Sequence, residues 1–93
     1  MMQTNFEMVD EFHDVYDCLR NDNPTLLSSK DWTLREHLIK EEFDELKKAY
    51  KDKNIVEFAK ELADLLYVCY GTAVAAGIDI DKVFEEVHAS NMS

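Results

Sequence analysis

TLREHLIKEEFDELKKAYKD (residues 33–52) and IVEFAKELADLLYVCYGTAVAA (residues 55–76) are the two stretches of sequence that decide the fold. In the first, apolar residues such as Leu34, Leu38 and Leu46 recur at the spacing of one helical face. The second is apolar almost all round, which is typical of a helix that is buried on most sides. Both stretches therefore predict long helices, joined by a very short connection.

Local signals place the ends of these two helices. Thr33 and Glu36 form the T-x-x-E pattern of a capping box, so we expect the first helix to begin at Thr33 and to run to about Asp52. Asn54 is expected to cap the second helix. Gly77 is expected to end it in the left-handed conformation.

Shorter helices are expected on either side of this pair. Apolar residues at helical spacing cover residues 4–20, and a loop then continues to about Trp32. A last helix is capped by one of the aspartates at positions 79 and 81 and ends near Ala89. With no repeat and no long linker, residues 1–93 are expected to form a single all-α domain, a subunit resembling a four-helix bundle.

Charge and composition exclude several classes of partner. Twenty acidic residues against ten basic ones give a formal net charge of −10, whereas a nucleic-acid polymer needs a basic surface. An anionic membrane likewise attracts basic segments. The apolar content of 46% is too high for a disordered acidic tail. We therefore expect neither nucleic-acid polymers nor membranes as partners.

The expected compartment is the cytoplasm. The N-terminal residues do not have the basic and then apolar pattern of a signal peptide. Cys18 and Cys69 lie in apolar helical patterns, where cysteine behaves as a small apolar residue, and they do not make a disulfide framework. The longest apolar segment, residues 62–78, carries Asp64 and predicts a buried helix.

Five carboxylates stand out because they lie on or beside apolar helical faces. Glu42 and Glu45 fall inside the apolar arc of residues 33–52, Glu41 lies at its edge, and Glu61 and Asp64 share a face of the next helix. One acidic pair at this spacing is usually a solvated face, but two pairs on consecutive apolar helices indicate a shared interior site. Carboxylates held together repel one another, and a divalent cation removes that conflict. Hard oxygen ligands suit Mg²⁺ or Mn²⁺, whereas zinc prefers Cys or His and a ferritin-like di-iron site uses Glu-x-x-His pairs.

The same residues carry a resemblance to a known superfamily. An E-E-x-x-E motif at residues 41–45 is followed, after a 15-residue spacer, by E-x-x-D at residues 61–64. This pattern resembles the signature of the all-α NTP pyrophosphatases, which include MazG-like proteins, dimeric dUTPases and phosphoribosyl-ATP pyrophosphohydrolases. Further matches extend over nearly the whole chain and resemble the small MazG-like, phosphoribosyl-ATP-pyrophosphohydrolase-like branch: they are Phe12-His13, residues 64–72, Gly77-Ile78-Asp79 and residues 87–93.

The resemblance implies roles for all five carboxylates. Four of them match the metal ligands of the family, namely Glu42, Glu45, Glu61 and Asp64. Glu41 matches the first Glu of the motif, which in the family supports a further metal or orients the attacking water. The lysine that follows Asn-Met-Ser in family members has no counterpart in residues 1–93.

The implied reaction is hydrolysis of a nucleoside triphosphate to the monophosphate and pyrophosphate, with Mg²⁺ as cofactor and Mn²⁺ as a substitute. The expected substrate is a deoxynucleotide in the control of nucleotide pools, either a purine such as dGTP or dATP, or dUTP. Phosphoribosyl-ATP is less expected, because the chain resembles the general MazG-like branch more closely. The P-loop pattern G-x-x-x-x-G-K is absent, so a Walker-type NTPase is excluded.

Other residues are candidates for binding the rest of the nucleotide. Asn91 matches a family Asn near the sugar and phosphates, and His13, Trp32 and Tyr67 can stack on or hydrogen-bond a base. Each of these three rings also has an ordinary structural interpretation, as a packing histidine, a hydrophobic staple and a core residue. Arg35 is a candidate phosphate contact.

Two alternatives to an enzyme remain open. A small acidic helical protein can hold a protein partner through its apolar helix at residues 55–76, and a metal or nucleotide sensor would keep the same carboxylates without turnover. Whatever the function, the almost wholly apolar helix at residues 55–76 would expose a large apolar patch in a monomer. We therefore expect a homodimer or homotetramer.

Overall fold

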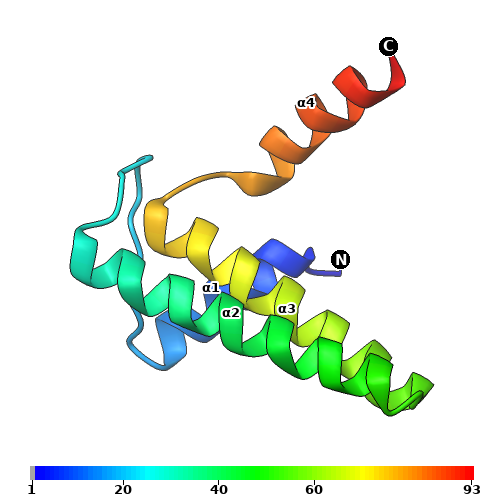
Figure 1. The fold of residues 1–93 in the computed structure, drawn as a ribbon. Helices are drawn as coiled ribbons and strands as arrows, with labels where there is room; N and C mark the ends of the chain where they lie inside the picture. The colour runs from blue at the N-terminus through cyan, green and yellow to red at the C-terminus, as the bar shows by residue number, and fades with distance from the viewer. Residues whose placement is uncertain (1) are drawn as a thin grey trace.

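The computed structural model describes residues 2–93, and it contains four helices and no β-strand in that range. The helices are α1 (Asn5–Val15), α2 (Ser29–Lys51), α3 (Ile55–Ala76) and α4 (Ile80–Met92) (Figure 1). The predicted all-α class is confirmed. No single helix of residues 2–93 is long and apolar enough to cross a membrane; α3 and α4 reach that length and hydropathy only as a pair bent by 115°.

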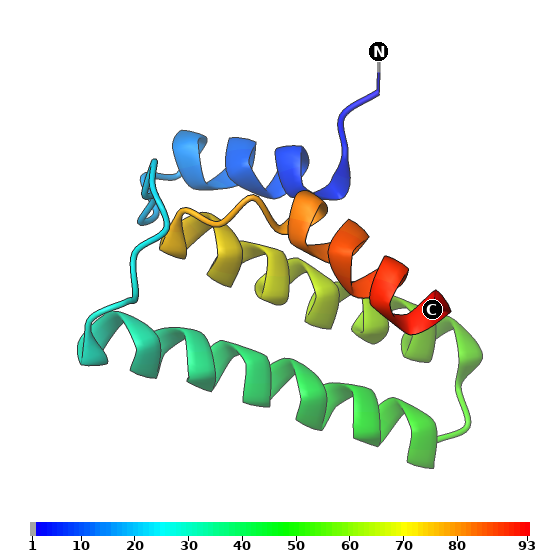
Figure 2. The same ribbon diagram turned by 90° about the horizontal axis from the view of Figure 1, so that it is seen from above.

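Helices α1, α2 and α3 form the packed unit of the molecule. α2 and α3 run antiparallel and side by side, and α1 lies against the other side of α3 (Figure 2). Only residues 52–54 connect α2 to α3, and such a short connection keeps the two helices neighbours. The buried apolar residues are mostly small, which lets the helices approach closely: they are Val9, Ala49, Ala73, Val74, Ala75 and Ala76.

The start of α2 differs from the prediction. Ser28 is the N-cap, and its side chain accepts a hydrogen bond of 3.2 Å from the backbone N–H of Asp31. The predicted capping box at Thr33 is therefore wrong, because Ser28 caps the helix five residues earlier and its side chain bonds the N–H of Asp31. The Thr33 hydroxyl instead donates to the carbonyl of Ser29, and Trp32 lies in the first turns of the helix rather than in a loop.

The ends of α3 agree with the prediction. Asn54 caps its start by accepting from the N–H of Glu57 at 3.1 Å, and Gly77 ends it with φ 68°. Glycine is required at this position twice over. Its φ is unfavourable for other residues, and a Cβ there would overlap the backbone carbonyl of Asn23.

The first helix is shorter than predicted. A capping box formed by Thr4 and Glu7 begins α1, and the helix ends at Val15 instead of continuing to about residue 20. The reason is local, because Asp17 adopts a left-handed φ of 59° that breaks the helical hydrogen-bond pattern. The chain then turns so that Leu19 lies beside α1, where its carbonyl meets His13.

Helix α4 stands apart from the other three (Figure 1). Asp79 caps its start, and it runs to Met92, beyond the expected end near Ala89. None of its residues is buried, and Phe84 is 68% exposed. The bundle within one chain is therefore built by α1–α3, and the apolar residues of α4 have no helix of the same chain to cover them.

Candidate metal centre and adjoining pocket

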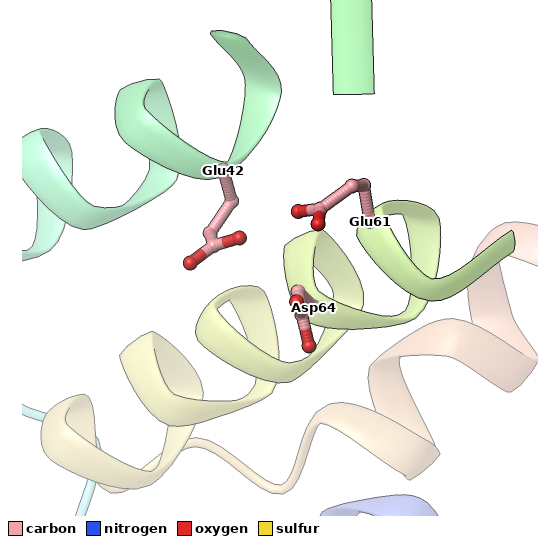
Figure 3. Close-up of side chains that lie close together, drawn as sticks. All are labelled: Glu42, Glu61 and Asp64. Atoms are coloured by element: carbon pink, nitrogen blue, oxygen red, sulfur yellow. The ribbon is translucent and has the colours of Figure 1, made fainter. Parts of the chain in front are cut away.

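Three carboxylates from two helices converge on one point. Glu42 extends from α2, and Glu61 and Asp64 extend from α3 toward it (Figure 3). One oxygen of each side chain lies within 4.8 Å of an oxygen of the other two. We call this group the carboxylate trio.

The helical hairpin explains why these residues meet. Glu61 and Asp64 are three residues apart and share one face of α3. On the facing side of α2, Arg35 contacts Val68 and Thr72, and Glu42 lies two turns farther along the same face. Because the helices are antiparallel, this register brings Glu42 opposite the acidic pair of α3.

The surroundings of the trio disfavour three free negative charges. Glu61 is only 8% exposed. Desolvation raises the pKa of Glu42 above its ordinary value, and the nearby charges of Asp64, Glu61 and Glu41 raise it further. Such a group gains from any cation that binds between the side chains.

Lys60 supplies one cation at the edge of the trio. Its Nζ lies 3.1 Å from Oδ2 of Asp64 and 3.3 Å from Oε1 of Glu61. These bonds raise the pKa of Lys60, so the ammonium stays charged. Lys60 therefore bonds the two trio members on α3, Glu61 and Asp64. Among the described side chains it forms no hydrogen bond with Glu42.

The other two predicted carboxylates lie beside the trio, outside it. Glu45 is exposed and lines a shallow groove together with Glu61, one turn of α2 beyond Glu42. Glu41 is exposed as well, and its carboxylate lies 3.3 Å from Nε2 of His37 on the outer face of α2. Their predicted roles in metal binding and catalysis remain predictions.

The donor set of the trio fits a hard divalent cation. All three residues offer carboxylate oxygens, and neither histidine nor cysteine belongs to the cluster in the described part of the chain. Oxygen ligands of this kind suit Mg²⁺, Mn²⁺ or Ca²⁺ rather than zinc. Desolvation and the neighbouring carboxylates disfavour the charged form of Glu42 and raise its pKa. A bound cation would offset this unfavourable electrostatic energy.

A pocket of about 400 Å³ lies along the same α2–α3 seam, on the side of α1. Two predicted base-binding residues, His13 and Tyr67, line it together with Arg35. Trp32 instead lines a separate apolar pocket that includes Thr72. Asn91 is exposed on α4, which stands apart, so the structure does not bring it to the trio within one chain.

Arg35 is held in place at this pocket. Its Nε donates to Oγ1 of Thr72 at 3.2 Å, and its Nη2 donates to the carbonyl of Val68 at 2.9 Å. Gly71, for which the sequence predicted no individual role, lies beneath this guanidinium, where a Cβ would overlap Nη2. The available signal was a lone glycine inside an apolar helix, which costs about 1 kcal/mol relative to alanine and usually has a packing reason.

A protein-family model matches most of the chain. The family model of phosphoribosyl-ATP pyrophosphohydrolase matches residues 9–91, a range that includes the trio, the groove beside it and the Arg35 pocket. No curated protein matches the chain. The chain therefore belongs to the phosphoribosyl-ATP pyrophosphohydrolase family, within the MazG-like all-α NTP pyrophosphatases, and is a pyrophosphohydrolase that acts on acid anhydride bonds of nucleotides.

Proposed function

We propose that this protein is a metal-dependent nucleoside triphosphate pyrophosphohydrolase, which converts a (d)NTP and water into a (d)NMP and pyrophosphate. The observation that carries the proposal is the carboxylate trio, Glu42, Glu61 and Asp64, gathered within 4.8 Å in a family of nucleotide pyrophosphohydrolases. Phosphoryl transfer depends mainly on positioning and charge neutralisation. A trio of carboxylates that binds a divalent cation provides a site for both.

The proposed cofactor is Mg²⁺, with Mn²⁺ as a substitute. The trio would hold the ion, and Glu45, which lines the groove beside Glu61, would complete the ligand set. A bound divalent ion supplies Lewis-acid neutralisation of phosphate oxygens. Glu41, whose exposed carboxylate contacts His37, is proposed to orient the attacking water, because it matches the first Glu of the family motif.

The proposed assembly is a homodimer or homotetramer. Val83 and Phe84 on α4 are 41% and 68% exposed, and Val87 on the same helix is 50% exposed. Leu62 and Leu66 on α3 are also exposed. Apolar faces on two helices of a 93-residue chain are typical of a self-complementary interface, which would also bring α4 of one subunit to another.

A substrate panel tests the proposed function. We expect pyrophosphate release from at least one of the canonical (d)NTPs with Mg²⁺ or Mn²⁺, and no release in EDTA. Phosphoribosyl-ATP belongs in the same panel, because it would give the alternative substrate of the family. Glu42→Gln should abolish release, and Glu36→Gln, an exposed carboxylate on the same helix, should leave it unchanged.

Each negative result has a distinct meaning. Orthophosphate as the only product would refute the pyrophosphohydrolase. Metal binding without turnover of any compound in the panel would favour the sensor alternative. Equal activity of Glu42→Gln and Glu36→Gln would show that the trio is not the catalytic site.

A further inference from the structure

Arg35 is a half-buried cation that forms no ion pair with a carboxylate of residues 2–93. Its two hydrogen bonds, to Thr72 and Val68, go to neutral oxygens. Of the five N–H groups of a guanidinium, two are used in this way and three remain for a ligand. A guanidinium that is held in place, is not paired with a carboxylate and has free N–H groups indicates a binding site for a ligand that offers hydrogen-bond acceptors.

The pocket around Arg35 has the walls of a site for a flat ring. Phe12 and Tyr67 contact each other edge to face, with ring centroids 5.8 Å apart, and Leu34 and Leu38 add apolar surface. The volume of about 400 Å³ falls in the range of small-molecule pockets. An aromatic base fits such walls, provided that its polar edge meets matching groups.

Hydrogen-bond acceptors accompany the donor fork. His13 Nδ1 lies 2.8 Å from the carbonyl of Leu19, which can only accept, so Nδ1 carries a proton and Nε2 is the ring nitrogen that is able to accept. Nε2 forms no hydrogen bond among the described residues, and His13 lines the pocket. Asp31 lines the same pocket and offers a carboxylate as a second acceptor.

Gly71 brings the donor and the acceptor together. A Cβ at this position would overlap Nη2 of Arg35 and would lie 3.1 Å from Nε2 of His13. Both groups therefore occupy the space above the glycine, side by side. The absence of a side chain makes room for the guanidinium and the imidazole, which present their nitrogens side by side to the pocket that both residues line.

We propose that the Arg35 pocket binds the guanine base of the nucleotide, an inference that rests on the proposed function and names its substrate. Guanine O6 and N7 accept from the free N–H groups of Arg35, the most common specific contact of arginine with a base. Guanine N1–H and the 2-amino group donate to His13 Nε2 and Asp31. Adenine would present its amino group, a donor, to the guanidinium, which is also a donor. Cytosine has two adjacent acceptors for the guanidinium, but it has only one donor group where guanine has two.

The position of the pocket agrees with a nucleotide that reaches the trio. Arg35 and Glu42 are seven residues apart on one face of α2, which corresponds to about 10.5 Å along the helix. Val68 and Asp64 follow the same seam on α3. A guanine nucleotide in the Arg35 pocket would therefore direct its phosphates along the seam toward the carboxylates.

The test is binding of deoxynucleoside monophosphates, measured by calorimetry in EDTA. We expect dGMP to bind about 10- to 100-fold more tightly than dAMP, dCMP or dUMP, the discrimination typical of a bidentate base contact. The analogues 7-deaza-dGMP, which lacks N7, and dIMP, which lacks the 2-amino group, should each bind more weakly than dGMP to the wild type. Equal binding of the four bases, tightest binding of another base, or full binding of 7-deaza-dGMP would overturn the proposal.

Variants provide the matched comparison. Arg35→Lys keeps the charge but loses the fork and should lose the preference for dGMP, and Gly71→Ala should lose it by displacing the guanidinium. Arg20→Lys, at an exposed arginine paired with Asp10, should retain it. The analogue series needs no variant and still decides the question if Arg35→Lys or Gly71→Ala fails to fold.

This experiment separates the pocket from the reaction. Monophosphate binding requires no hydrolysis, so a preference for dGMP without pyrophosphate release from dGTP would support the pocket and refute the enzyme. Pyrophosphate release without any base preference would support the enzyme and refute the pocket.

Discussion

Removing one charge from the trio should stabilise the metal-free protein. Glu42 has an oxygen within 4.8 Å of oxygens of both Glu61 and Asp64, and two unit charges at that distance in water repel by about 0.9 kcal/mol. Two such pairs give about 1.7 kcal/mol, of which the ammonium of Lys60 offsets a part. Glu42→Gln should therefore gain about 1 kcal/mol of unfolding free energy, or about 4–8 °C in Tm for a domain of this size.

The assay is thermal unfolding in EDTA at low salt, with all proteins at one concentration because an oligomer has a concentration-dependent Tm. Glu36→Gln is the control, since it removes one exposed charge from the same helix and should change Tm little. Adding Mg²⁺ or Mn²⁺ should raise the Tm of the wild type and of the control but not that of Glu42→Gln. A destabilised Glu42→Gln variant, or one that responds to metal as the wild type does, would refute the electrostatic reasoning.

Three further predictions concern pH, the lysine and the assembly. The pKa of Glu42 is raised in the folded state, so protonated Glu42 contributes its full stability below the unfolded pKa of about 4.5 and loses that contribution as pH rises through the folded pKa. The Tm advantage of Glu42→Gln over the wild type in EDTA should therefore grow from acidic to neutral pH. An advantage that does not change with pH would contradict this. Lys60→Gln removes the ammonium that competes with a metal ion for Glu61 and Asp64. Calorimetry should therefore find the Mn²⁺ affinity raised about two- to fivefold, the scale of an exposed ion pair, whereas weaker Mn²⁺ binding would show that Lys60 supports the site. Phe84→Glu places a charge on the exposed face of α4 and should convert a dimer or tetramer into smaller species in light scattering, an expectation that a monomeric wild type would disprove.

Much of the fold was predictable because local signals and helical periodicity agree. Asn54 and Gly77 bound α3 as their cap chemistry predicts. The start of α2 was misplaced because two capping sequences lie only five residues apart, and the helix begins at Ser28 instead of Thr33. The position of α4 could not be predicted, because its apolar spacing predicts a buried face without specifying which chain covers it.

The site was predictable as a set of residue types but not as a geometry. Anomalous carboxylates on apolar faces identified all members of the trio, and the structure brings Glu42, Glu61 and Asp64 together. Helical spacing could not separate them from Glu45, which lies on the same side of α2 but is exposed. The role of Gly71 depends on a close approach across two helices, which no periodicity encodes.

The products of hydrolysis test the central claim most directly. Incubation of dGTP with the protein and Mg²⁺, followed by ³¹P NMR, should give dGMP and pyrophosphate in equal amounts, with no dGDP. The same reaction should not occur with Glu42→Gln or in EDTA, because the trio would no longer hold the cation. Formation of dGDP and orthophosphate, or equal pyrophosphate release by Glu42→Gln, would contradict the account.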